Sequence, residues 1–296
     1  MRSNAACMLT GMTTTPSTTL VLGGTGKTGS RVAAQLAELG LNARTAARAG
    51  ADVHFDWDDP STYRPAVAGV DRVYLVGPVM RMDFAGQVST FLDLAEANGV
   101  RHVTYLSAYG IDQAPPQVAL RAVELDLISR GALTHSILRP AWFMQNFSET
   151  FLTPVDGVIT VPTGDGAEAF VDVEDIAAVA TATLAHPDAH AGAHYAPTGP
   201  EAITVSDAAD LIAEVTGQPV KHNDIDRDTW VEGSVAAGVP AEYGEMLRML
   251  TETIASGRGS RPNSDVQNVT GAPPTSFADF ARGLVSGPKR PVSFGS

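Results

Sequence analysis

The sequence has 296 residues, 44% of them hydrophobic, and a mean hydropathy of +0.02, so it can bury a sizeable core in one large or two modest domains. Its formal net charge of −13 argues against a nucleic acid or an anionic membrane surface as the main partner. No run approaches the ~18 apolar residues of a membrane span, and the single cysteine, Cys7, fits a reducing cytoplasm, so we expect a cytoplasmic globular protein.

The first structural element is a glycine-rich turn between a strand and a helix. Residues 1–17 lack the apolar core of a secretory signal and are expected to form a disordered tail. Residues 18–32 then read TTLVLGGTGKTGSRV. A short apolar run precedes the glycines, and apolar residues recur at helical spacing after them until Gly40, which predicts a buried strand, a turn and a helix.

Two kinds of phosphate-binding loop could explain these glycines. A Walker-type loop would need a glycine at position 21, where the chain has Val21. A dinucleotide-binding turn needs three glycines, and either Gly24, Gly26 and Gly29 or the wider set beginning at Gly23 supplies them. The strand and helix around the turn favour the dinucleotide, whose diphosphate the free N–H groups and the helix dipole would receive. A structural turn and a nucleotide kinase are the alternatives.

The elements that follow alternate between strands and helices, which predicts an α/β fold with a Rossmann-type, doubly wound parallel sheet. Expected strands cover residues 41–48, 51–57, 72–76, 101–107 and 133–140, and expected helices cover residues 60–68, 84–98 and 120–130.

From about residue 150 the pattern changes. We expect a hairpin over residues 157–171 around Gly164-Asp165-Gly166, then a helix over residues 174–185. The remaining expected elements are a strand, helix and strand within 201–225 with a capping box of Thr204 and Asp207, two helices within 227–256 broken at Pro240, and a last helix over 275–285.

This change of pattern predicts two parts. An NAD(P)-binding domain covers residues 18–150, with residues 171–186 packing back on it. Residues 151–296 mainly form a smaller α+β substrate-binding region across the carboxyl edge of the sheet, where open α/β folds bind their ligands.

The residues after the second strand indicate which dinucleotide is bound. An acid there would hydrogen-bond the 2′-hydroxyl of NADH, but the chain has Arg44 and Arg48 and no acid before Asp52. A guanidinium matches a 2′-phosphate in charge and geometry, so NADPH is favoured over NADH. Both arginines could instead be surface charge, Arg44 especially. Asp56 and Trp57 could hold the adenine, although a buried anchor tryptophan is the competing interpretation.

Several motifs together resemble one family. The segments LVLGGTGKTG, FDWDDPSTYRPAVAGVDRVYLV, GVRHVTYLSAYG, SILRPAWFMQNF, PTGDG and FVDVEDIAAVA are similar to those of the NmrA-like atypical short-chain dehydrogenases, and closest to the ergot-alkaloid (agroclavine dehydrogenase-like) reductases and relatives in bacterial secondary metabolism. The resemblance implies bound NADP and these contact residues: Gly23, Thr25, Gly26, Lys27, Thr28, Gly29, Arg48, Asp56, Trp57, Val76, Gly77, Pro78, Ser107, Ala108 and Tyr109.

One departure from short-chain dehydrogenases bears on the chemistry. Those enzymes protonate the product with a tyrosine whose pKa is lowered by a lysine four residues on, and none of the six tyrosines here has such a lysine. The catalytic acid is therefore unknown, with Ser107 and Tyr109 as candidates. Hydride transfer to an iminium needs no acid, a quinone accepts hydride readily, and a ketone beside a phenol could receive the phenolic proton.

The resemblance places the segment WFMQNF beside the nicotinamide and the substrate. Its aromatic and apolar side chains suit a bulky polycyclic substrate, although residues at this spacing are more often core. The expected substrate residues are Trp142, Phe143, Met144, Gln145, Asn146 and Phe147. Candidate lid residues are Met80, Met82, Phe84 and the helices around Trp230 and Tyr243.

The sequence thus predicts an NADPH-dependent reductase acting on a C=O or C=N group, with no metal, because Pro187 and Gly192 interrupt the spacing of His186, His190 and His194. The alternative is a non-catalytic dinucleotide sensor that binds a protein partner. The oligomeric state is not predicted.

Overall fold

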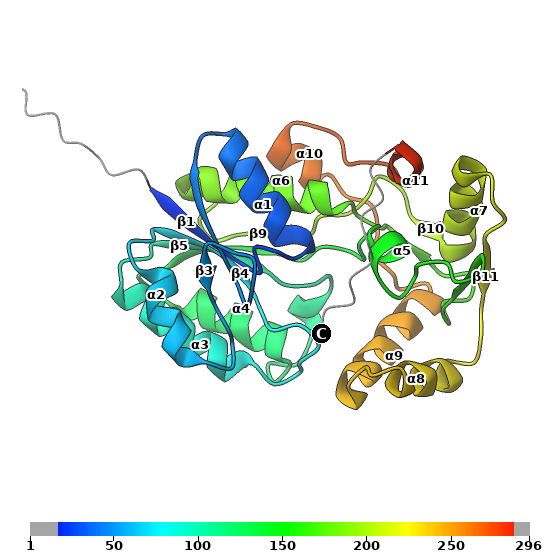
Figure 1. The fold of residues 1–296 in the computed structure, drawn as a ribbon, viewed down its shortest axis with the longest axis horizontal. Coiled ribbons are helices and arrows are strands. Elements are labelled where there is room, and N and C mark those ends of the chain that lie inside the picture. The colour runs from blue at the N-terminus through cyan, green and yellow to red at the C-terminus, as the bar shows by residue number, and fades with distance from the viewer. Residues whose placement is uncertain (1–16, 287–296) are drawn as a thin grey trace, which may run out of the picture.

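Within residues 17–286, the part of the chain that the computed structural model describes, seven parallel strands form the central sheet (Figure 1). The tail expected over residues 1–17 lies outside the described residues except for its last one. The strand order is β3-β2-β1-β4-β5-β6-β9. The bounds are β1 Thr18–Leu22, β2 Asn42–Ala47, β3 Val53–His54, β4 Arg72–Val76, β5 His102–Leu106, β6 Thr134–Leu138 and β9 Ala193–Tyr195.

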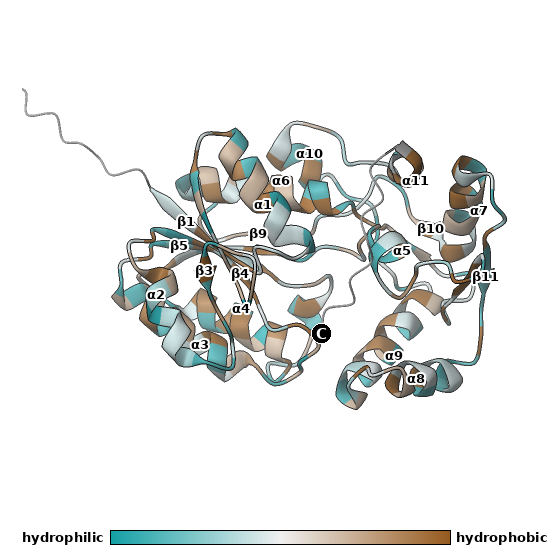
Figure 2. Cartoon of the chain, viewed as in Figure 1, coloured by the Kyte–Doolittle hydropathy of each residue, from teal (hydrophilic) through white to brown (hydrophobic). Residues whose placement is uncertain are grey.

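Helices cover both faces of this sheet. One face carries α1 (Lys27–Glu38), α6 (Val173–Ala185) and α10 (Asp265–Thr270), and the other carries α2 (Tyr63–Val67), α3 (Ala85–Ala97) and α4 (Ala119–Ser129) (Figure 1). In Figure 2 these helices alternate brown apolar and teal polar residues, as helices with one buried face do. The sheet is doubly wound, which confirms the Rossmann-type fold expected from the sequence.

Two strands differ from the sequence-based expectation. The third strand was expected over residues 51–57 but pairs only at Val53–His54. The chain turns soon afterwards, because the Asp56 carboxylate accepts a hydrogen bond from the backbone N–H of Asp58 at 3.0 Å. Strand β9 was not expected, and its three residues are too few to show a readable alternation.

The other elements form a smaller α+β region at one end of the sheet (Figure 1). Its core contains Phe147, whose ring packs edge to face on those of Phe170 at 5.1 Å and Phe277 at 5.0 Å. The bounds are α5 Asn146–Glu149, β7 Val158–Thr160, β8 Ala167–Glu168, β10 Ile203–Thr204, α7 Val205–Thr216, β11 Lys221–Asn223, α8 Arg227–Ala236, α9 Ala241–Ala255 and α11 Phe277–Ser286. The break at Pro240 and the capping box of Thr204 and Asp207 are confirmed.

The hairpin expected around Gly164-Asp165-Gly166 is wrong. Strand β7 pairs with β11 in parallel, and β8 pairs with β10 in antiparallel fashion, so β7 and β8 are not partners. The glycines serve other needs: the Gly164 N–H donates to Asp224 at 2.9 Å, and a Cβ on Gly166 would lie 2.0 Å from the Ile254 carbonyl oxygen. Close approach to α9 therefore explains Gly166.

Helix α6 returns to the central sheet and packs on α1. Its first turn is tied to the start of α11, because the Asp175 carboxylate accepts hydrogen bonds from the Thr275 backbone N–H at 2.7 Å and hydroxyl at 3.2 Å. The boundary near residue 150 stays a prediction. None of the helices described for residues 17–286 combines the length and apolar character needed to cross a membrane.

Asp175 predicts a dependence of stability on pH. Burial, opposed by the Thr275 N–H, raises the pKa of Asp175 to about 6, above its unfolded value of 3.8. The native state therefore binds this proton more tightly, and its stability falls as pH rises from about 4 to 6. We expect the free energy of unfolding of Asp175→Asn, measured relative to that of wild type, to rise by on the order of 1 to 2 kcal/mol from pH 4 to pH 7.5. Urea unfolding at both pH values measures this, and parallel pH curves for the two proteins would contradict it.

Candidate dinucleotide-binding site

The turn after β1 has a backbone that only glycine can follow. Gly23 has a φ of +63°, in the left-handed region. A Cβ on Gly24 would lie 2.6 Å from the Thr45 Cβ, and one on Gly29 would lie 2.2 Å from the Gly23 carbonyl oxygen. The three positions thus provide a tight turn, close contact with β2 and close packing of α1 on the turn, which are the needs of a dinucleotide-binding loop.

The start of α1 can receive a diphosphate. Gly26 is its N-cap and offers no side chain to the amides of the first turn, and Gly23, Thr25 and Gly26 are exposed. Unpaired amides and the positive end of the helix dipole therefore face open space. The residues here fit the diphosphate of a dinucleotide, with Thr28 buried beneath them.

Arg48 and Arg44 have different roles in the structure. Arg44 donates to the carbonyl oxygens of Ala66 at 3.3 Å and Ala68 at 2.7 Å, so its guanidinium closes the end of α2. Arg48 is exposed in the turn after β2. This turn lies beside the glycine loop, because a Cβ on Gly50 would be 3.7 Å from the Thr25 methyl group. Of the two arginines, Arg48 is the one beside the glycine loop, and its contact with a ribose phosphate stays a prediction.

The acid nearest this turn has partners already. The Asp52 carboxylate accepts hydrogen bonds from the Thr45 backbone N–H at 2.8 Å and the Thr45 hydroxyl at 2.7 Å. These bonds, the backbone one foremost, lower the pKa of Asp52. The carboxylate holds β2 to the turn, which argues against its binding a ribose hydroxyl.

Trp57 belongs partly to an aromatic cluster. Its ring lies edge-on to Phe55 at 4.9 Å and to Phe91 at 5.6 Å, so the anchor role is real. The residue is nevertheless only half-buried, as is Asp56. Contact of either side chain with adenine stays a prediction.

Ser107 lies in a buried charged network, not free at the end of β5. Its hydroxyl donates to Glu124 at 2.7 Å, and the Glu124 carboxylate, which is fully buried, also accepts from Arg121 at 2.7 Å and from Arg139 at 2.8 and 2.9 Å. Burial opposes ionisation, but the hydrogen bonds from Arg139, Ser107 and Arg121 outweigh it and lower the pKa of Glu124. The Ser107 proton is committed, which argues against Ser107 as the catalytic acid.

The neighbouring candidates are more accessible. Ala108 is half-buried, and Tyr109 is 38% exposed with its backbone N–H donating to the Pro140 carbonyl at 3.0 Å. This bond holds the Tyr109 backbone near the carboxyl edge of the sheet. Of the two candidate acids, Tyr109 is the accessible one, and its protonation of the product stays a prediction.

An eight-residue loop, residues 77–84, projects from the end of β4. Val76, Gly77 and Pro78 are half-buried where it starts, and the Phe84 ring closes its base, since a Cβ on Gly77 would lie 3.0 Å from that ring. Met80, in the loop, has a φ of +58°. Arg81 forms an ion pair with Asp58.

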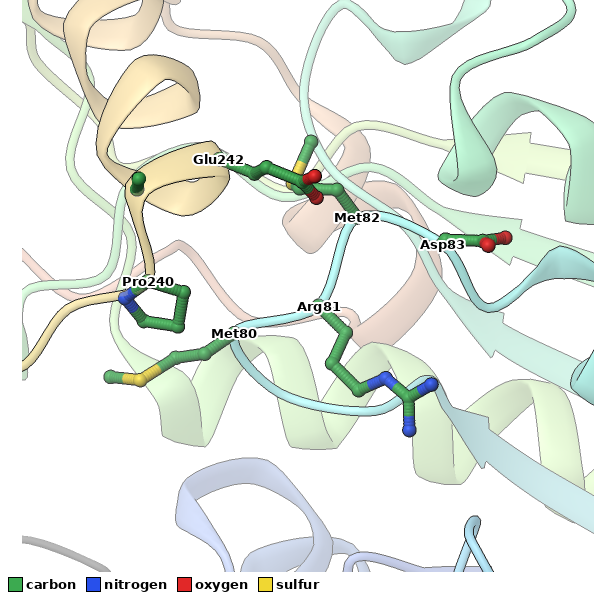
Figure 3. A pocket seen from close by; sticks show the side chains of 7 residues that line it. Met80, Arg81, Met82, Asp83, Pro240 and Glu242 are labelled. Carbon is green, nitrogen blue, oxygen red and sulfur yellow. The ribbon is translucent and has the colours of Figure 1, made fainter.

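This loop lines one side of an open cavity of about 370 Å³, and the start of α9 lines the other (Figure 3). Figure 3 shows Glu242 extending from α9 toward Met82, while Arg81 and Asp83 point away from the helix. The lining residues are Met80, Arg81, Met82, Asp83, Pro240, Ala241 and Glu242. The lid residues expected from the two halves of the chain, Met80 and Met82 on one side and the helix of Tyr243 on the other, thus meet here.

The segment WFMQNF divides its side chains between core and cleft. Met144 and Phe147 are 1% and 2% exposed, and Gln145 bonds Asp172 at 2.9 Å and the Val173 N–H at 3.0 Å. Phe143 packs toward the α1 and α6 side of the sheet. The contacts of Met144, Gln145 and Phe147 are structural, which argues against the substrate role expected for these three.

Trp142 and Asn146 are half-buried, as is Phe143, and the Trp142 side chain packs against the core of the smaller region. The Trp142 ring lies edge-on to Phe151 at 5.5 Å, and Phe151 contacts Trp230 at 6.3 Å. Sequence reasoning missed Phe151, which is 40% exposed. Its place just after the motif was the available signal.

Lys27 contacts a second residue that sequence reasoning missed. Its ammonium donates to the Thr150 hydroxyl at 3.3 Å, across 123 residues of chain. Among residues 17–286, His, Cys, Asp and Glu side chains form no group that could hold a metal ion.

Comparisons with known proteins agree with this geometry. Residues 23–187 match the NAD(P)H-binding family. The chain is 35% identical to the uncharacterized oxidoreductase YesF of Bacillus subtilis, over 88% of this chain and 93% of that protein. It is 31% identical to agroclavine dehydrogenase of Claviceps fusiformis, over 89% and 96%. The triphenylmethane reductase of Citrobacter sp. complexed with NADP(H) aligns with a TM-score of 0.69 and 21% identity, over 90% and 99%.

The glycine turn, the doubly wound sheet and these matches lead to one conclusion, and they confirm the resemblance drawn from the motifs. The chain belongs to the NAD(P)H-binding family, among the NmrA-like atypical short-chain dehydrogenases.

Proposed function

We propose that the protein is an NADPH-dependent oxidoreductase that transfers hydride to a C=O or C=N group of a bulky polycyclic metabolite. One observation carries this proposal: the loop that begins at Val76, Gly77 and Pro78, where the resemblance puts the coenzyme, continues directly into the cavity lining at Met80. A molecule in the cavity would lie beside the coenzyme. NADPH, when bound, supplies the hydride.

The volume of the cavity and the two methionines in its lining suit a ring system, beside the charged side chains of Arg81, Asp83 and Glu242. The cavity volume of about 370 Å³ lies within the range of small-molecule sites, about 300 to 1,000 Å³. The thioethers of Met80 and Met82 adapt to irregular apolar shapes. The half-buried Trp142 and the exposed Phe151 form a separate aromatic surface, with ring centroids 5.5 Å apart.

The chemical class of the hydride acceptor follows from the lack of a protein acid: the Tyr–Lys pair is missing, and Ser107 donates its proton to Glu124. Because the Ser107 proton is committed to Glu124, an acceptor that needs no strong protein acid is favoured. Hydride transfer to an iminium carbon neutralises the cation and yields an amine and NADP⁺. A quinone takes the hydride and a proton from water or from the substrate to give a hydroquinone.

The names of the relatives favour a catalyst over the alternative of a dinucleotide sensor. YesF is described as an oxidoreductase and the Claviceps protein as a dehydrogenase. An open cavity next to the expected coenzyme loop supports the same choice, because a sensor needs no such space.

The choice of coenzyme is tested at Arg48. We expect Arg48→Ala to weaken NADPH binding by about ten-fold or more while leaving NADH nearly unchanged, because a charge-assisted bond to the 2′-phosphate would be lost. Arg44→Ala is the matched control, since that guanidinium caps α2, and it should not discriminate between the two. Calorimetry with each dinucleotide measures the effect. Equal losses for both in Arg48→Ala would contradict the role.

The reaction itself is tested by NADPH oxidation against a panel of polycyclic quinones, hydroxyanthraquinone-type ketones and cyclic iminium salts, with NADH in parallel. We expect turnover of at least one class, with NADPH preferred. Tight NADPH binding without turnover of any of the three classes would overturn the proposal in favour of the sensor.

A further inference from the structure

We propose that Lys27 and Thr150 form a bridge through which bound coenzyme orients the Asn146 side chain for the substrate. The inference rests on the proposed function for the identity of the substrate, but the bridge itself is a contact between the glycine turn and α5. Lys27 and Thr150 are positioning residues in this proposal, and Asn146 is the residue that meets the substrate.

The bridge is a chain of two hydrogen bonds. The Lys27 ammonium donates to the Thr150 hydroxyl at 3.3 Å, and the Thr150 hydroxyl donates to the Asn146 Oδ1 at 3.0 Å. All three residues are half-buried. Lys27 is the first residue of α1, directly after the Gly26 N-cap. The chain of bonds therefore runs from the diphosphate loop to the polar residue of the WFMQNF segment that the core does not occupy.

The direction of these bonds is set by chemistry. An ammonium group can only donate, so the Thr150 hydroxyl must accept from Lys27 and has its single proton left for Asn146. That proton goes to the amide oxygen, which fixes the flip of the amide. The Nδ2 group of Asn146 is then the free end, with two protons available to a carbonyl or quinone oxygen.

The charge around Lys27 makes the bridge responsive to coenzyme. Burial lowers the pKa of Lys27, Glu149 opposes this, and Arg31 adds to it. Arg31 in turn lies 3.7 Å from Glu149 and 2.7 Å from Glu174. A diphosphate on the adjacent amides adds negative charge close to the ammonium, which favours keeping the Lys27 side chain in this position beside Thr150. Coenzyme binding should thus strengthen the bridge and prepare Asn146, so that coenzyme binds before substrate.

The test uses the full chain and hydrogen exchange with NADP⁺ as the ligand. Two amides report on α5: Glu149, whose N–H bonds the Gln145 carbonyl at 2.8 Å, and Leu152, whose N–H bonds the Asn146 carbonyl at 3.1 Å. We expect NADP⁺ to slow their exchange by about ten-fold in wild type. In Thr150→Val we expect NADP⁺ affinity within about two-fold of wild type but no slowing.

Two further variants separate the bridge from a general effect on structure. Thr150→Ser keeps the hydroxyl and should restore the response. Thr153→Val is the matched control, because the Thr153 hydroxyl is buried without a hydrogen-bond partner in the described part of the chain, and it should respond as wild type does. A response that survives in Thr150→Val, or is lost in Thr153→Val as well, would overturn the proposal.

Kinetics with a quinone of the panel, 9,10-phenanthrenequinone, add a second readout. Thr150→Val should raise KM about ten-fold with a much smaller change in kcat, because Asn146 loses its preferred orientation before substrate binds. A fall in kcat at unchanged KM would count against the bridge. If no panel member is reduced but the exchange response depends on Thr150 as expected, the bridge stands and the proposed reductase function fails.

Discussion

Replacing Gly29 with alanine is expected to reduce NADPH affinity by about 100-fold or more, which corresponds to about 2.7 kcal/mol. The added Cβ would lie 2.2 Å from the Gly23 carbonyl oxygen and 2.7 Å from its carbonyl carbon, and backbone cannot rotate away as a side chain can. The turn must shift, and with it the amides that receive the diphosphate. Calorimetric titration with NADPH measures the loss, and thermal unfolding checks that the variant still folds.

Gly86→Ala is the matched control for this substitution. Gly86 lies in the first turn of α3, where a Cβ would meet nothing within 4 Å. Alanine favours a helix more than glycine does, so this variant should bind NADPH as wild type does and be equally or more stable. Wild-type affinity in Gly29→Ala would show that the turn has room to adapt and would remove the steric argument for this glycine.

The sequence was sufficient for the central sheet because its signals are local. The apolar run before Gly23 and the helical spacing after Gly29 describe one strand–turn–helix unit, and each later strand and helix carries its own periodicity. The order of the first six strands follows from such units with few alternatives. Strand β9 was not predicted because it has only three residues. Its formation depends on pairing with β6, a tertiary contact that leaves no pattern in the sequence.

The region after residue 150 was harder to predict because its short strands pair across long stretches of chain. The Gly164-Asp165-Gly166 sequence is typical of a hairpin turn, yet β7 finds its partner in β11 and β8 finds its partner in β10. A glycine allows a tight turn and a close approach equally well. The sequence alone cannot distinguish the two uses. In the structure Gly166 allows the close approach of α9.

The candidate site shows the same limit for side chains. The motif WFMQNF predicts aromatic surface, but which ring faces the cleft depends on the direction in which the segment leaves β6. The Phe147 ring is buried in the core of the smaller α+β region, whereas the Trp142 ring contacts the exposed Phe151. The Lys27–Thr150 contact is separated by 123 residues and has no sequence signal of its own.

The buried network around Glu124 carries the second large prediction. Glu124 on α4 is fully buried, and Arg139 just after β6 donates to both of its oxygens, so the pair joins a helix to the edge of the sheet beneath the cleft. We expect Arg139→Met to lower the free energy of unfolding by about 3 to 5 kcal/mol, because it leaves a buried carboxylate short of its main partner. Urea unfolding at neutral pH measures this loss.

Removing the charges of both Glu124 and Arg139 should lower the free energy of unfolding less than removing the charge of Arg139 alone. In Glu124→Gln combined with Arg139→Met, the neutral amide can still accept from Ser107, needs no buried counter-charge, and leaves the partly exposed Arg121 to turn from the amide NH2 toward water, so the double variant should be more stable than Arg139→Met alone by about 1 to 2 kcal/mol. Arg101→Met is the matched control. Arg101 pairs with Asp71 at 3.2 Å while 73% of its side chain is exposed, so its loss should cost less than about 1 kcal/mol. If the two single arginine variants were equally stable, the Glu124 network would be no more than surface charge, and its placement of Ser107 away from the substrate would lose its energetic basis.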